Sequence, residues 1–130
     1  MIESIEGYLV LLEQSSRNAI TETAPMDVWV SILESRPDLA ADVAMNKNLP
    51  ASILDRLIAG KCSRARSLVA MKRSLNDEQF RKLSTDKDES VRNIIANNKK
   101  TPVSILEQLL TDPWDFVAHS AKEQLQARSS

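Results

Sequence analysis

The chain has few of the residues that proteins use for cross-links, sharp turns and catalysis. Its 130 residues include one cysteine, one histidine and two glycines, and aromatic residues make up 4%. The single cysteine, Cys62, excludes an internal disulfide framework. No apolar run reaches the roughly 18 residues of a membrane span, and Glu3 and Glu6 stand where a signal peptide has basic residues. We therefore expect a cytoplasmic protein that makes no use of a membrane.

Helix-forming residues are abundant instead. Hydrophobic residues make up 42% of the chain and charged residues 27%. Leu, Ala, Glu and Lys are frequent, and runs of β-branched residues are few, a balance that favours α-helices. A chain of 130 residues is long enough to bury one hydrophobic core. We therefore predict an all-α protein with a single domain, residues 1–130.

A pattern with a period of 26 residues runs along the chain. Thr101-Pro102 follows Leu75-Asn76 by 26 residues, and Leu75-Asn76 follows Leu49-Pro50 by the same interval. An earlier copy, shorter by one residue, begins near Pro25. Periods of roughly 20–50 residues are typical of solenoids, so we expect about four two-helix units. The apolar residues that recur in register are Leu54, Phe80 and Leu106; Leu57, Leu83 and Leu109; Ala65, Val91 and Val117; and Val69 and Ile95.

The best-formed unit, VRNIIANNKKTPVSILEQLLTDPWD, resembles the leucine-rich repeat variant (LRV) unit, a relative in shape of HEAT repeats. The resemblance covers residues 25–116. The middle unit departs from it, because Leu75-Asn76 replaces Thr-Pro and Ser84 replaces an apolar residue. The resemblance implies a right-handed α-solenoid, or superhelix, in which an α-helix alternates with a short, often 3₁₀, helix. Some LRV proteins carry an N-terminal cysteine cluster for an iron–sulfur centre. This chain lacks that cluster, so we expect no cofactor and no metal.

The repeat register divides the predicted superhelix into segments. We expect an N-terminal capping helix within residues 1–23 and repeats at residues 24–48, 49–74, 75–100 and 101–127, the last extended as a C-terminal cap. Terminal units of a solenoid need a polar outer face, which is the role we assign to the two caps.

Several local signals refine these helices. The spacing of Ile2, Ile5, Leu9 and Leu12 predicts one buried face on the N-terminal helix. We expect Thr101 to cap a helix that begins at Pro102, and the spacing of Asn76 and Gln79 predicts a capping box. Trp29 shares a position with apolar residues of the later repeats, so we expect it in the core. Residues 128–130 are expected to fray.

No set of catalytic residues can be assembled from the sequence. The lone histidine, His119, has no nucleophile or orienting carboxylate at a recognisable spacing. Lys61 and Arg64 lie beside Cys62 in the sequence, but no histidine lies near it, so we expect a non-functional thiol. Metal-ligand spacings and glycine-rich phosphate loops are also missing. We therefore expect no enzymatic activity. A base-excision glycosylase on a HEAT-like scaffold is less favoured, because no acid–aromatic pocket can be assembled.

Six residues are our candidates for binding a partner: Trp114, Phe116, Arg66, Arg64, Lys72 and Arg73. Trp114 follows Pro113 in a loop, and Phe116 occupies a repeat position that holds polar residues in the preceding units. These two aromatic residues form either a plug that closes the C-terminal end or a docking patch.

Arg66 and Arg92 share one repeat position, which has two interpretations. Ladders of basic residues line the grooves of some solenoids. Alternatively, each arginine pairs with a loop carboxylate, such as Asp86 or Asp88 for Arg92. No acidic residue precedes Arg66 in residues 60–65, so the second interpretation is weaker there.

The net charge of −1 is unevenly distributed, since residues 61–82 hold seven basic and two acidic residues. We favour a non-catalytic protein–protein interaction module, such as a small immunity protein, an antitoxin or an adaptor, with another protein as its partner. The alternative is a nucleic-acid-binding repeat protein that uses the 61–82 basic segment. Against it stand a pI near 5.8 and the scarcity of aromatic residues for base stacking. The oligomeric state stays open.

Overall fold

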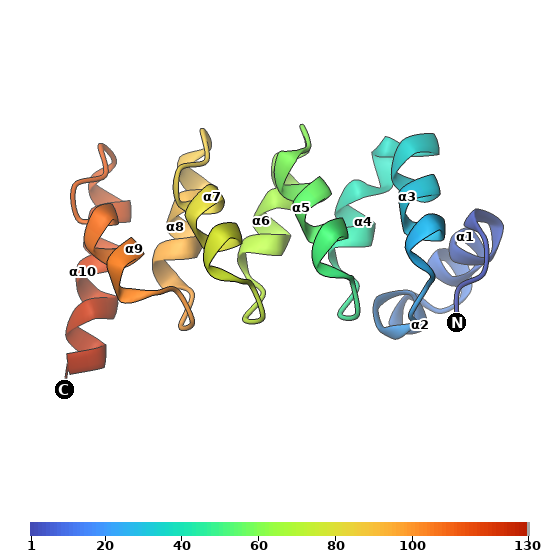
Figure 1. Ribbon diagram of the computed structural model, residues 1–130, viewed down its shortest axis with the longest axis horizontal. Helices are drawn as coiled ribbons and strands as arrows, with labels where there is room; N and C mark the ends of the chain where they lie inside the picture. Colours follow the sequence, from blue (N-terminus) through green and yellow to red (C-terminus); the bar gives the residue numbers. More distant parts are fainter. Residues whose placement is uncertain (130) are drawn as a thin grey trace. The chain divides into compact units, whose positions relative to one another are not determined.

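The structure, a computed structural model, describes residues 1–129 and is entirely helical over that range. It contains ten α-helices and one 3₁₀-helix among the described residues (Figure 1). The all-α prediction is therefore confirmed. The chain divides into two compact units, an N-terminal unit that ends at Ala65 and a C-terminal unit that begins at Arg66. The boundary falls within helix α6 (Ser63–Ala70).

The N-terminal unit begins with two helices where we expected one. Ser15 interrupts the helical path with φ −154° and ψ 79°, so the predicted capping helix is split. The hydroxyl of Ser4 caps the first helix by accepting a hydrogen bond from the backbone N–H of Gly7 at 3.0 Å. The complete helices of this unit are α1 (Ile5–Gln14), α2 (Ser16–Thr21), α3 (Met26–Ser35), η1 (Pro37–Leu39), α4 (Ala40–Ala44) and α5 (Ala51–Ala59).

Two aromatic residues pack α1 against α3 in the core of the N-terminal unit. Tyr8 and Trp29 are fully buried, and their ring centroids lie 5.6 Å apart in an edge-to-face arrangement. The core position predicted for Trp29 is confirmed. Ile2 is buried as expected, but Tyr8 is the one buried residue of α1 itself. The residues Ile5, Leu9 and Leu12 of the predicted face are only partly buried.

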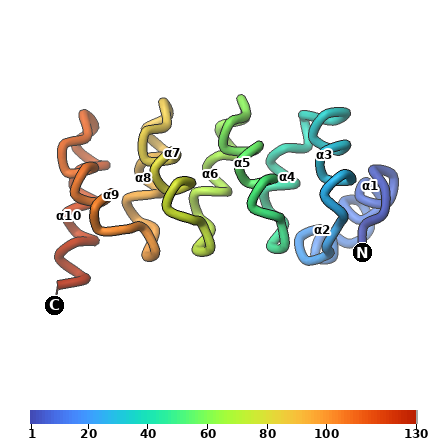
Figure 2. The backbone as a smooth tube through the Cα atoms, viewed as in Figure 1, coloured from blue at the N-terminus to red at the C-terminus, as the bar shows by residue number. Residues whose placement is uncertain are grey.

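The C-terminal unit is built from two adjacent pairs of helices. The contacts join α7 to α8 and α9 to α10, and they also join α7 to α9 and α8 to α10 (Figure 2). The predicted capping box is confirmed, since Asn76 Oδ1 accepts from the Gln79 N–H at 2.8 Å and Gln79 Oε1 accepts from the Asn76 N–H at 3.0 Å. The helices after α6 are α7 (Asp77–Ser84), α8 (Glu89–Asn97), α9 (Val103–Leu109) and α10 (Asp115–Ser129).

Two predictions about helix ends in this unit are wrong. Helix α9 begins at Val103 with Pro102 as its N-cap, and the buried Thr101 instead donates its hydroxyl to the Ile95 carbonyl at 2.7 Å. Helix α10 continues to Ser129, because Arg128 donates hydrogen bonds to three backbone carbonyls of the loop before α9. The predicted fraying therefore does not occur at residues 128–129, and residue 130 lies outside the described residues.

The 26-residue register recurs in the burial of side chains. The apolar residues that we aligned from repeat to repeat are buried in both units, from Leu54 and Leu57 to Leu106 and Leu109. Each short second helix is too brief to be stable alone, so this packing holds it in place. Over residues 1–129, no helix combines the length and the apolar character needed to cross a lipid bilayer.

Candidate functional site

The start of α10 presents two aromatic side chains next to each other. Trp114 is 49% exposed and Phe116 is 43% exposed. Their ring centroids lie 5.8 Å apart, with the ring planes tilted by 59°. Trp114 is the last loop residue before α10, and Phe116 lies in the first turn. Because nearly half of each residue faces solvent, the geometry favours a docking patch over a buried plug.

A buried ion pair holds the loop that carries Trp114. Asp112 Oδ1 accepts a hydrogen bond from the Trp114 backbone N–H at 3.0 Å. Arg92 binds the same carboxylate with both ends of its guanidinium, Nε to Oδ2 at 2.8 Å and Nη2 to Oδ1 at 3.2 Å. The side chains of Arg92 and Asp112 are only 11% and 4% exposed. The bidentate geometry fixes the orientation of the carboxylate and, through it, the backbone at Trp114.

This ion pair shifts the pKa of both partners. The hydrogen bond to Asp112 is the main cause that raises the pKa of Arg92. Burial by itself raises the pKa of Asp112, but the hydrogen bonds from Arg92 and from the Trp114 backbone outweigh burial, and the pKa is lowered. Asp112 is therefore ionised at neutral pH and keeps its contact with the tryptophan loop.

Arg66 makes the same kind of pair one period earlier. Its Nε lies 2.8 Å from Asp86 Oδ2, and the two side chains are 5% and 7% exposed. The sequence indicated Asp86 or Asp88 as the partner of Arg92 and no local acid for Arg66, but both arginines bind a carboxylate 20 residues downstream. Asp88 is the N-cap of α8 instead, and the backbone carbonyl of Asp86 accepts a hydrogen bond from Arg92 at 2.7 Å. The guanidinium of Arg66 is thus enclosed, and Arg66 leaves our set of surface candidates.

The remaining basic candidates are spread along the chain. Arg64 is exposed in the first turn of α6. Lys72 and Arg73 lie in the loop between α6 and α7, where burial lowers the pKa of Lys72. Arg73 is exposed and lines a cavity of about 270 Å³ together with Asn97 and Lys99. Of the six candidates, the structure brings the rings of Trp114 and Phe116 together.

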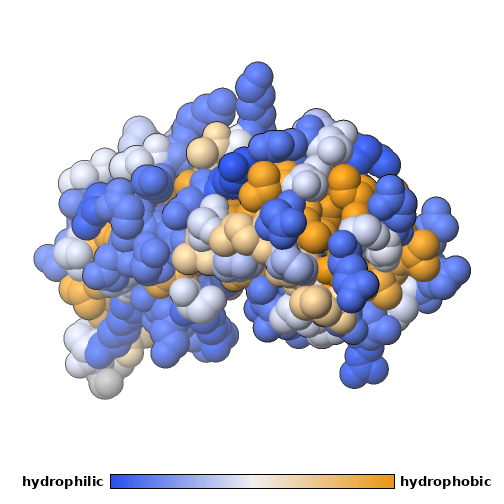
Figure 3. Space-filling model, turned by 45° about the vertical axis from the view of Figure 1, so that its right-hand side comes forward, coloured by the Kyte–Doolittle hydropathy of each residue, from blue (hydrophilic) through white to orange (hydrophobic). Residues whose placement is uncertain are grey.

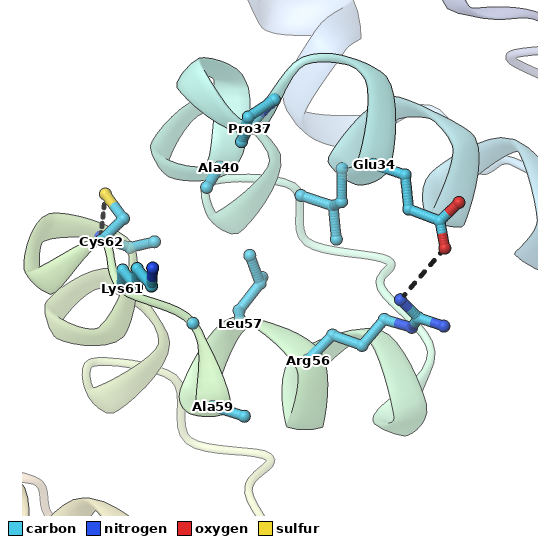
Figure 4. A pocket seen from close by; sticks show the side chains of 11 residues that line it. Glu34, Pro37, Ala40, Arg56, Leu57, Ala59, Lys61 and Cys62 are labelled. Carbon is cyan, nitrogen blue, oxygen red and sulfur yellow. Dashed lines mark hydrogen bonds and ion pairs between the residues drawn. The ribbon is translucent and has the colours of Figure 1, made fainter.

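The N-terminal unit contains a larger cavity that no sequence pattern had indicated. It has a volume of about 600 Å³ and lies between the α3–η1–α4 segment and α5 (Figure 4). Its walls are mostly apolar and include Pro37, Ala40 and Leu57. Figure 3 shows hydrophobic residues that reach the surface over this unit, on the right of the view. The polar residues that line the cavity are Glu34, Arg56, Lys61 and Cys62.

The residues that we weighed for catalysis make ordinary local contacts. His119 lies 2.9 Å from Glu123 on an exposed face of α10, and the thiol of Cys62 accepts a long hydrogen bond of 3.4 Å from the Ala65 N–H. Within residues 1–129, no group of three His, Cys, Asp or Glu side chains is arranged to hold a metal ion.

Comparisons of this chain with protein-family models, with curated proteins and with solved structures find no match. The function is therefore inferred from the geometry of each unit.

Proposed function

We propose that this protein is a non-catalytic protein–protein interaction module built from LRV/HEAT-like repeats in a right-handed superhelix. The observation that carries the proposal is the exposed pair of Trp114 and Phe116. Aromatic residues, tryptophan above all, dominate the energetic centres of protein interfaces. A solenoid with such an anchor would serve in the cytoplasm as an immunity protein, an antitoxin or an adaptor.

The rigidity of the aromatic pair supports this function. An exposed side chain contributes most to binding when little freedom is lost on association. The Arg92–Asp112 pair holds the backbone of Trp114, and the Trp114 carbonyl in turn accepts the N–H groups of Val117 and Ala118 at the start of α10. The adjacent Asp115 is exposed and adds a negative charge beside the rings. The partner surface that fits this chemistry is an apolar pocket with a basic edge.

The burial, pairing and separation of the basic side chains in residues 61–82 favour a protein partner over nucleic acid. Binding to phosphates needs several accessible cations on one surface. Arg66 is buried against Asp86, and Arg81 pairs with Glu78 on its own helix. Lys72 and Arg73 precede α7, whereas Arg81 and Lys82 lie in its last turn, so the two basic pairs stand at opposite ends of that helix.

The test is affinity capture from the cells that express the protein, with each extract split into nuclease-treated and untreated halves. We expect one protein in stoichiometric amount, retained after nuclease and lost with the double variant Trp114→Ala/Phe116→Ala. Val10→Ala is the matched control, because Val10 is an apolar residue of the N-terminal unit with a similar exposure of 48%. Circular dichroism would verify that all variants are folded. Capture that survives the double variant, or recovery of nucleic acid with proteins lost after nuclease, would overturn the proposal.

A further inference from the structure

The large cavity lies at the repeat position where the C-terminal unit holds a buried ion pair. In that unit Arg66 reaches Asp86, and the same pairing recurs one period later. The residue 26 positions before Arg66 is Ala40, and the residue 26 positions before Asp86 is Gly60. Both line the cavity. Ala40 of the first repeat and Gly60 of the second are therefore small residues at the positions where the pair one period later has a guanidinium and a carboxylate.

The size and lining of this cavity are those of a binding pocket. Its volume of about 600 Å³ lies within the range of roughly 300–1,000 Å³ typical of ligand sites. Leu57 points from α5 toward Pro37 and Ala40 on the opposite side (Figure 4). An aromatic ring that enters this space is covered by apolar groups on both sides, which is a favourable environment for it.

The charges around the cavity favour a ligand that carries a negative charge next to its aromatic ring. Lys61 is exposed, and within residues 1–129 no carboxylate pairs with it. Arg56 lies 3.7 Å from Glu34, and the two side chains are 51% and 66% exposed, so solvent screens this long pair. Two basic residues and one acidic residue thus surround the apolar walls. A carboxylate next to the buried ring complements this arrangement.

We propose that the cavity between α3–η1–α4 and α5 binds an acidic peptide segment of a partner protein, in which an aromatic side chain stands beside a carboxylate. The ring occupies the space between Leu57 and Ala40, and the carboxylate pairs with Lys61. This inference rests on the proposed protein-binding function but uses a surface other than the Trp114–Phe116 pair. The cavity gives the N-terminal unit a recognition site of its own, and the exchange of Arg–Asp for Ala–Gly creates it.

The first test is NMR titration of the full ¹⁵N-labelled chain with the blocked dipeptide N-acetyl-Trp-Glu-amide. We expect saturable shifts of the backbone amides of Ala40, Gly60, Lys61 and Cys62. N-acetyl-Trp-Lys-amide should bind roughly threefold more weakly than the Trp-Glu probe, because it lacks one solvent-exposed charge pair. N-acetyl-Ala-Glu-amide lacks the ring and should cause no saturable shift. Failure of the Trp-Glu probe to saturate, or equal binding of all three probes, would overturn the proposal.

The second test fills the cavity with the pair that the later repeats use. Ala40→Arg/Gly60→Asp should abolish the shifts. Gly60 has an extended backbone, and a Cβ there would lie 3.3 Å from the Leu57 carbonyl oxygen, so aspartate needs only a small adjustment. Ala118→Arg is the matched control, because Ala118 has the same repeat position in α10. A folded double variant that binds like the parent would contradict the proposal.

Lys61→Glu tests the same site without filling the cavity, and so applies even if the double variant does not fold. This variant should reverse the preference between the acidic and basic probes, and an unchanged preference would count against the role of Lys61. Sedimentation of the parent separates a foreign partner from a second copy, whose own Trp114-Asp115 has the same chemistry. Self-association that Ala40→Arg/Gly60→Asp removes would overturn the assignment to a partner protein. If the parent does not bind the Trp-Glu probe but its partner capture still depends on Trp114, only the cavity site is refuted. If the parent binds the probe but its partner capture does not depend on Trp114, only the proposed function is refuted.

Discussion

Asn46 and Asn98 stand 52 residues apart, two periods of the repeat, and use their side-chain amides in the same way. Each donates from Nδ2 to two backbone carbonyls at the end of a preceding helix, and each accepts at Oδ1 from the N–H two residues later. The carbonyls at the last turn of a helix have no partner within that helix. One buried amide therefore closes a helix end and shapes the next loop. The carbonyls belong to Ala19 and Glu22 for Asn46, and to Ala70 and Lys72 for Asn98.

Asn98→Ala should lower the free energy of unfolding by about 1–3 kcal/mol, because it takes the amide donor from two carbonyls and the acceptor from the Lys100 N–H. Urea unfolding monitored by circular dichroism measures the change. Asn97→Ala is the neighbouring control, since the side-chain amide of the exposed Asn97 donates to the Asn93 carbonyl of its own helix. Equal effects of the two substitutions would refute a special role for Asn98.

Asp86→Ala should destabilise the protein by about 3–5 kcal/mol, because it leaves the buried guanidinium of Arg66 without its counter-charge. The comparison is Asp38→Ala, which breaks the solvent-exposed pair with Arg36 and should change the urea midpoint little. If both substitutions shifted the midpoint equally, burial would not be the source of the effect.

Acidification should lower the free energy of unfolding, in part because Asp112 becomes protonated. The pKa of its carboxyl is lower in the folded protein than the ordinary value of about 3.9, so its stabilising contribution is complete above that value. The contribution is lost as the pH falls below about 4 and through the folded pKa. Urea unfolding between pH 7 and pH 3 should show this decline for the parent. Asp112→Asn, which does not titrate, should be less stable at pH 7 and lose less stability on acidification. Parallel curves for the two proteins would contradict this prediction.

Tyr8→Phe should leave the free energy of unfolding within about 1 kcal/mol of the parent value, or raise it. The Tyr8 hydroxyl is buried and finds no hydrogen-bond partner among residues 1–129, so its removal relieves a desolvated polar group. Burial is also the main cause that raises the pKa of the Tyr8 phenol. Tyr8→Ala, which removes the ring that packs on Trp29, should cost about 3–5 kcal/mol. Thermal and urea unfolding of both variants provide the measurement. A large loss of stability in Tyr8→Phe would show that the hydroxyl makes a stabilising contact.

Local sequence patterns predicted the features that depend on neighbouring residues. The apolar spacing placed Leu83, Ile95 and Leu106 in the core, and the Asn76–Gln79 spacing identified a real capping box. Such signals act within one or two helical turns, so they can be read without the fold. The errors at Thr101 and Arg128 arose where hydrogen bonds to backbone carbonyls outside the local helical turn override local preference. Thr101 does not cap the helix as expected, because its buried hydroxyl donates instead to the Ile95 carbonyl, which also accepts from the Asn98 N–H.

The sequence by itself determined the helical class, the 26-residue period and most of the buried positions, because hydrophobic periodicity reports directly on which face of a helix is inside. Only the tertiary structure decided which acid each arginine meets. The partners of Arg66 and Arg92 are 20 residues away, and folding brings them together. The cavity corresponds to a feature of the sequence: the small residues Ala40 and Gly60 stand at the repeat positions of Arg66 and Asp86. These small residues could be interpreted only with the structure, because it shows that the corresponding positions one period later hold a buried arginine–aspartate pair.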